Sequence, residues 1–189
     1  MTTEQRDHYD NLIYLCGDHH TQIDKQEKDF PVNTLLEMKK EHATKFRNAT
    51  NEAFAEVGFA ELGKATDWII RIQPLQSIQN FTLVAPEEKI RKNDLSDKVR
   101  VTIAMGLGIA EEVRSFIESE AKNDSDFPDR LKAGFLEEYY RLRKEGLTGD
   151  ALFDLMCQFA QRGFREQAKR SAGLAVLIYL FEACEVFEK

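Results

Sequence analysis

The sequence has no apolar run that could cross a membrane and few residues that break helices. A transmembrane helix needs about 18 or more consecutive apolar residues, and no such stretch occurs in this chain. Only four prolines and ten glycines interrupt the 189 residues, which favours helices. The N-terminus shows no signal-peptide pattern. We therefore expect a cytoplasmic, mainly helical protein that has no membrane partner.

Cysteine and positive charge are also scarce. The three cysteines, Cys16, Cys157 and Cys184, are widely spaced, and an odd, scattered set excludes a disulfide framework and indicates a reducing compartment. The formal net charge is -7, so the average field of the protein repels polyanions. Any contact with nucleic acid must therefore come from a local basic patch or from a bound metal ion.

The potential metal ligands are concentrated near the N-terminus, in residues 11–24. Residues 12–16 form a short apolar run that we expect to be extended, followed by a turn and a short helix that Asp18 caps. Hydrolysis of a phosphodiester by a metal enzyme needs an ion that neutralises charge on the phosphate and a base that activates water. His20, near the start of the helix, can hold an ion through one imidazole nitrogen while the other meets a second partner.

Two neighbouring runs resemble the C-terminal half of HNH endonucleases of the NL-x-x-LC-x-x-HH-x-x-ID type: YDNLIYLCGDHHTQID and DFPVNTLLEMKKEH. The resemblance covers residues 9–42 and implies a ββα-metal module that cuts DNA, with RNA left open. It implies that Asn11 and His20 are catalytic and that His20 is the final ligand of a Mg, Mn or Zn ion. Cys16 and His19 form a C-x-x-H pair, which in zinc-containing members completes a structural zinc site with an upstream C-x-x-C.

The first half of such a motif is missing. The strand that carries the first histidine, usually in an A-H-I-like segment, does not precede Asn11, and His8 is too close to form a hairpin with it. The upstream cysteine pair is missing as well. We therefore expect that the natural reading frame begins earlier and that Met1 is an internal methionine. Loss of a general base lowers a rate by about 10²–10⁴-fold, so we do not expect these residues alone to retain catalysis.

Some residues of this module also have plainer interpretations. Cys16 could be a small buried residue rather than a zinc ligand. His42 is more typical of a helix surface than of a metal site. The basic residues of the module could face phosphates or form a solvated face, since acids are interleaved with them. They are Lys25, Lys28, Lys39, Lys40, Lys45 and Arg47.

Apolar periodicity predicts helices along most of the remaining chain. The expected helices are 31–52, 59–72, 87–92, 96–120, 128–146, 148–161 and 166–186, with a short strand at 81–84. A break at 48–51 is expected to separate a truncated HNH module, residues 1–52, from an α-helical domain, residues 54–189. Gly106 and Gly108 are predicted to allow close helix packing rather than to bind a nucleotide. Cys157 and Cys184 are predicted to lie in the core.

Two segments of the helical domain look like the C-terminal domain of effectors in bacterial ABC three-component conflict systems: FPDRLKAGFLEEYYRLRKEGLTGDALFDLM and AGLAVLIYLFEACEVFEK. The resemblance covers residues 85–189. It implies that the domain ties a toxic effector, often a nuclease, to an ABC-type ATPase and a middle component in anti-phage defence. The last helix is almost entirely apolar between residues 172 and 181, which is typical either of an interface or of the central helix of a bundle.

The sequence therefore predicts a mainly α protein in which a partial ββα-metal (HNH) module precedes an α-helical, partner-binding domain. Its expected function is that of a metal-dependent DNA endonuclease effector. The alternative is a non-catalytic interaction or regulatory module derived from such a nuclease.

Overall fold

The computed structural model describes residues 13, 15–72, 85–183 and 187, and these residues form helices and turns without a strand. The mainly α class is confirmed, whereas a ββα arrangement is not shown by this part of the chain. The expected strand at 81–84, Asn11 and Cys184 lie outside the described residues. By its internal contacts the chain divides into two compact units, residues 1–49 and residues 50–189.

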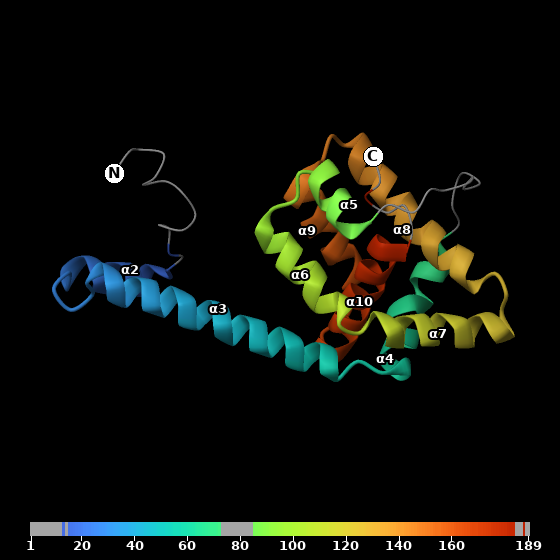
Figure 1. Ribbon diagram of the computed structural model, residues 1–189, viewed down its shortest axis with the longest axis horizontal. Coiled ribbons are helices and arrows are strands. Elements are labelled where there is room, and N and C mark those ends of the chain that lie inside the picture. Colours follow the sequence, from blue (N-terminus) through green and yellow to red (C-terminus); the bar gives the residue numbers. More distant parts are fainter. Residues whose placement is uncertain (1–12, 14, 73–84, 184–186, 188–189) are drawn as a thin grey trace. The chain divides into compact units, whose positions relative to one another are not determined.

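The first unit contains α2 (Gly17–Lys25) and the greater part of α3 (Val32–Ala55) (Figure 1). The N-cap of α2 is Cys16, which makes no side-chain capping bond. The prediction that Asp18 caps this helix was wrong, because α2 begins one residue before Asp18. Asp18 lies in the first turn instead, where its negative charge still interacts favourably with the helix dipole.

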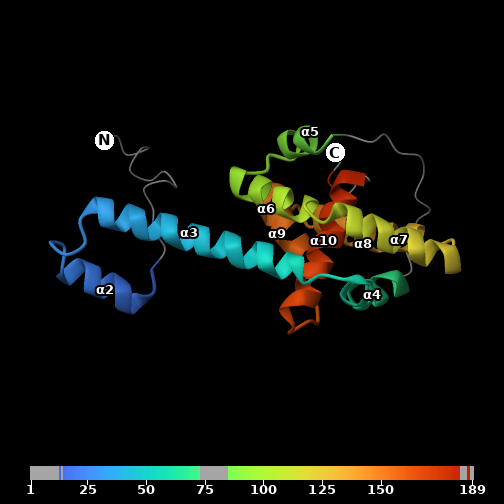
Figure 2. The ribbon, with the colours of Figure 1, turned by 60° about the horizontal axis from the view of Figure 1, so that its bottom comes forward.

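Helix α10 (Gln167–Ala183) is the core of the second unit (Figure 2). Its side chains are buried on all faces, from Ser171 to Phe181, apart from half-buried Leu174 and Tyr179. Four helices pack against it: α4 (Phe59–Asp67), α6 (Asp97–Leu107), α7 (Ala110–Asn123) and α9 (Gly149–Ala160). The last helix is therefore the central helix of the bundle, which decides between the two expectations for it.

The remaining elements complete the shell around α10. Helix α8 (Phe127–Lys144) packs on the 3-10 helix η2 (Ile69–Arg71), on α7 and on α9. Helix α5 (Pro86–Lys92) contributes Lys89, a fully buried cation whose Nζ donates to the Phe181 carbonyl at 2.7 Å. That carbonyl lies in the last turn of α10, where the helix dipole favours a positive charge.

Two predicted helices are each divided in the structure. The expected helix 96–120 is broken at Gly108 and Ile109 into α6 and α7, and both halves pack against α10. The expected helix 59–72 becomes α4 followed by η2. Gly106 does allow a close approach, since a Cβ on it would lie 2.2 Å from Cδ1 of Ile178. No helix among the described residues is long and apolar enough to span a membrane.

Gly173 marks a close backbone approach between α10 and the end of α9. A Cβ on Gly173 would lie 2.0 Å from the carbonyl oxygen of Ala160 and 2.8 Å from its carbon. Because backbone atoms cannot move away cheaply, we expect Gly173→Ala to lower the free energy of unfolding by roughly 1–3 kcal/mol. Urea denaturation of the whole chain, followed by circular dichroism, measures this change.

Gly63→Ala is the matched control. Gly63 lies inside α4, and a Cβ there would meet no atom within 4 Å. Alanine should therefore raise the free energy of unfolding, by up to about 1 kcal/mol, through helix propensity alone. Equal stability of the two variants would contradict the close approach of α9 and α10.

Candidate metal-binding turn

The first turns of α2 carry two side-chain pairs. Cys16 Sγ lies 2.9 Å from Nδ1 of His19, and Nδ1 of His20 lies 2.9 Å from Oδ2 of Asp24. The pairs follow from helical spacing, since residues three or four apart are neighbours on a helix surface. The helix begins here because the His20 amide donates to the Cys16 carbonyl at 2.9 Å.

Both pairs are accessible to solvent. No residue of α2 is buried, and the side chains of His20 and Asp24 are 68% and 64% exposed. An exposed ion pair contributes little to stability. The His20–Asp24 pair therefore has little weight in holding the fold, but an ion or a phosphate can reach it directly.

His20 has the arrangement of a metal-binding histidine that a carboxylate orients. When its proton is on Nδ1, that N–H donates to Asp24, and Nε2 presents its lone pair away from the carboxylate. Carboxylate–histidine–metal arrays use this arrangement, in which the carboxylate fixes the ring and raises its basicity. The chemistry of His20 and Asp24 thus fits one position in the coordination shell of a divalent ion.

Cys16 and His19 offer a second type of metal chemistry. The backbone N–H of His19, and then its ring, lower the pKa of the exposed Cys16 thiol below its usual value. Zinc–ligand distances of about 2.3 Å to sulfur and 2.0 Å to nitrogen place tetrahedral ligand atoms roughly 3.5 Å apart. The observed separation is short enough for both atoms to share one ion after a small rotation. The pair supplies two of the four ligands that a structural zinc site needs.

The structure joins four residues of the motif in two separate pairs, Cys16 with His19 and His20 with Asp24. Among the described residues, no group of three or more His, Cys, Asp and Glu side chains gathers where it could hold a metal ion. His42 is exposed on α3, as expected of a surface residue. Asn11 lies outside the described residues, so its predicted role stays a prediction.

Cys157 is half-buried on the core side of α9, in agreement with its predicted packing. It packs against the hydrophobic core of the second unit. Burial, and secondly the nearby carboxylate of Asp154, raise the pKa of its thiol to about 12. The thiol pKa is therefore lower than usual at Cys16 and higher than usual at Cys157.

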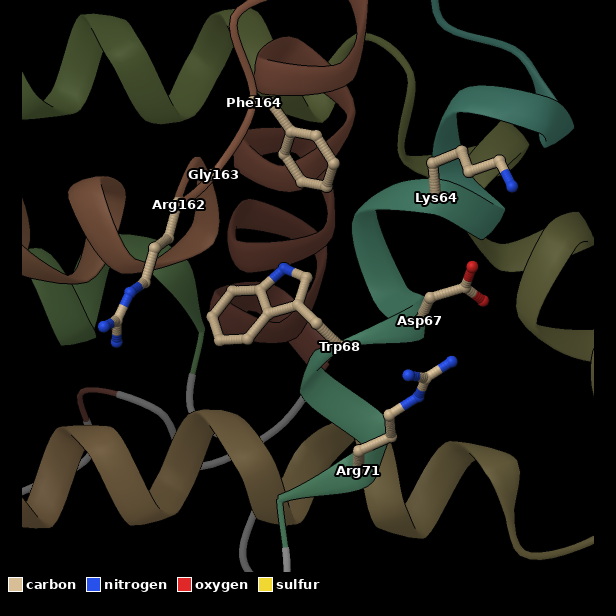
Figure 3. Close-up of a pocket in the computed structure, with 7 residues that line it drawn as sticks. All are labelled: Lys64, Asp67, Trp68, Arg71, Arg162, Gly163 and Phe164. Atoms are coloured by element: carbon tan, nitrogen blue, oxygen red, sulfur yellow. The ribbon is translucent and has the colours of Figure 1, made fainter.

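Sequence reasoning missed two features. Asp24 was recognised as part of the motif but not as the partner of His20, although the spacing of four residues is a usable signal. A pocket of about 400 Å³ in the helical unit was also missed (Figure 3). Its lining comes from residues 64–71 and 162–164, which lie too far apart in the sequence for any local pattern to join them.

Comparisons with known proteins identify no relative. No protein-family model, curated protein or solved structure matches the chain.

The opposite pKa shifts of the cysteines predict a large difference in reactivity. At pH 7 a thiol whose pKa is about 12 is only about 10⁻⁵ thiolate, whereas Cys16 is ionised more than an ordinary cysteine. Because the thiolate is the reacting species, iodoacetamide should label Cys16 faster than Cys157 by orders of magnitude. Peptide mass spectrometry of the folded, chelator-treated chain measures both rates.

Substitution of His19 tests the cause of this difference. His19→Ala removes the ring but keeps the backbone N–H, so labelling of Cys16 at neutral pH should slow by a few-fold. His20→Ala is the matched control, because the ring of His20 pairs with Asp24. Equal rates in the three proteins would show that the His19 ring does not act on the thiol.

Proposed function

We propose that this chain carries the metal-holding half of an HNH-type endonuclease, which acts as an effector in a bacterial defence or conflict system. The observation that carries the proposal is the pairing of His20 Nδ1 with Asp24 at 2.9 Å on an exposed helix. Both residues stand in the register of the NL-x-x-LC-x-x-HH-x-x-ID motif. The local geometry agrees with the role that the motif assigns to His20.

In this proposal the imidazole of His20 would hold one divalent ion, Mg, Mn or Zn. The bound ion would neutralise the charge that develops on the phosphate and on the leaving oxygen. Asp24 keeps the imidazole in the orientation and tautomer that ligation needs. By the resemblance, Asn11 orients a strand histidine, and that histidine removes a proton from the attacking water as the phosphorus–oxygen bond to the leaving group breaks.

Cys16 and His19 have a separate role in the proposal. Their thiolate and imidazole form half of a structural zinc site that holds the turn before α2. The other half would be a cysteine pair, as in the zinc-containing members that the motif resembles. Zinc there would stabilise the local fold, and the ion at His20 would take part in the reaction.

The helical unit is the partner-binding part of the proposal. The resemblance to effectors of ABC three-component systems suggests an ABC-type ATPase and a middle component as its partners. Because α10 is buried as the core, contact with these proteins falls on the outer helices. Val101 of α6 and Tyr140 of α8 are large apolar side chains exposed by 49% and 53%, and they are natural places for such contacts.

Plasmid nicking tests the endonuclease directly. Protein purified from its native gene should nick supercoiled DNA when Mg²⁺ or Mn²⁺ is present and should stop when the ion is chelated. His20→Ala should lower the nicking rate by more than about 10²-fold, because a ligand is lost together with its orientation. Gel separation of nicked and supercoiled plasmid measures the rate.

Gln22→Ala is the matched control for this substitution. Gln22 is exposed on the same helix and occupies an unspecified position of the motif, so nicking should be unchanged. Nicking that survives in His20→Ala, or no metal-dependent nicking by the parent protein, would contradict the proposal. The second result would favour a non-catalytic interaction module.

Asp24→Asn tests the orienting carboxylate. Asparagine keeps the size of the side chain but removes the charge, so the imidazole becomes less basic and less firmly held. Metal affinity, measured by calorimetric titration of Mn²⁺, should fall by roughly 10–100-fold. The same substitution at the exposed Asp29, Asp29→Asn, should have no effect. Equal affinities of all three proteins would mean that Asp24 does not support a metal ligand.

A further inference from the structure

The pocket of the helical unit has aromatic walls and a charged rim. It measures about 400 Å³ and lies between the α4–η2 segment and the turn that follows α9. Trp68 and Phe164 are half-buried and pack against the core, while Lys64, Arg71 and Arg162 are exposed. This volume is in the range of ligand-binding clefts, and apolar walls with a few polar groups are typical of them. The pocket is an open surface depression rather than an enclosed cavity.

Trp68 is held in a fixed orientation at the centre of the pocket. Its indole packs against Phe159 in a T-shaped contact, with ring centroids 4.7 Å apart and an interplanar angle of 67°. Its Nε1 is buried and makes no hydrogen bond within the described residues. Figure 3 shows this edge of the indole turned toward Phe164.

The cations stand on both sides of the indole. In Figure 3, Arg162 lies on one side of the ring, whereas Lys64 and Arg71 lie on the other side with Asp67. None of these three cations forms an ion pair within the part of the chain that the structure describes. With one carboxylate against three cations, the pocket is locally positive on a chain whose net charge is -7.

We propose that this pocket binds a short stretch of single-stranded nucleic acid, with one base against Trp68 and the flanking phosphates near Arg162 and Arg71. A planar aromatic platform between two cationic positions matches a polymer in which planar bases alternate with phosphates. A mononucleotide engages one cationic side at a time. In a duplex the bases are stacked on one another and do not reach the indole.

This inference goes beyond the endonuclease proposal and does not depend on it. The pocket lies within residues 50–189, uses no metal ion and does not involve His20. Binding should therefore persist when a chelator is present, and His20→Ala should bind the strand as the parent chain does. Failure of nicking and failure of strand binding are thus separate results.

Trp68 is the only tryptophan of the chain, so its fluorescence reports on this pocket alone. A short oligothymidylate, titrated into the full chain at low salt with chelator, should quench the fluorescence to saturation. The affinity should fall as salt is raised, because phosphate contacts release counterions. Thymidine monophosphate should bind at least about tenfold more weakly, because it engages the cations on only one side of the indole. A duplex of equal length should also bind at least about tenfold more weakly, because its bases do not reach the indole.

Substitution of the two arginines locates the phosphate contacts. Arg162→Gln and Arg71→Gln should each weaken oligothymidylate binding by several-fold and reduce the slope of log affinity against log salt by about one. Arg165→Gln is the matched control. It removes the same charge from the same turn, and Arg165 is exposed and does not line the pocket. Circular dichroism checks that each variant stays folded.

Three outcomes would overturn the inference. The first is the lack of any saturable quenching by the oligonucleotide. The second is an equal loss of affinity in Arg165→Gln and Arg162→Gln, which would show a diffuse electrostatic effect. The third is thymidine monophosphate that binds as tightly as the strand, which would make the pocket a small-molecule site.

Discussion

The helical unit depends on the burial of α10 between Ser171 and Phe181, because α4, α6, α7 and α9 pack against it and cover its apolar surface. Such burial requires helix backbones to approach closely, and glycines are placed where they do. Gly173 faces the carbonyl of Ala160, and Gly106 faces Ile178. The charged and aromatic groups that could bind a ligand are consequently left at the rim of the bundle. Trp68 illustrates this. Its indole packs on the core residue Phe159 and also lines a surface pocket.

Much of this fold could be predicted, because apolar residues at helical spacing indicate the helices. Leu131, Phe135, Tyr139 and Leu142 recur at helical spacing and are all buried, and Gly146, with a φ of 87°, follows the end of α8. The break between α6 and α7 could not be predicted in this way. Val99, Ile103 and Val113 are buried on both sides of it, so the periodicity runs through. The break falls at Gly108, the C-cap of α6, and both halves pack against α10.

The difference between local and distant contacts also explains which site residues could be predicted from the sequence. Cys16, His19 and His20 could be assigned to one turn because they lie within five residues of one another. The cap of α2 was wrongly assigned to Asp18, since Asp is favoured both at the N-cap and in the first turn. The pocket could not be predicted, because Trp68 and Arg162 lie far apart in the sequence. Only the packing of α4 and α9 around α10 brings them together.

The two proposed nucleic-acid contacts differ in local charge, and therefore in whether they need a metal ion. At α2, Asp18 and Asp24 are exposed, and their carboxylates repel a phosphate unless a divalent ion stands between them. In the endonuclease proposal, binding of nucleic acid at α2 would therefore require a divalent ion. At the pocket, Lys64, Arg71 and Arg162 outnumber Asp67, so a strand can bind without a metal. Together, the two proposals describe a protein that would hold a strand at the pocket without an ion and would engage a phosphate at His20 only with one.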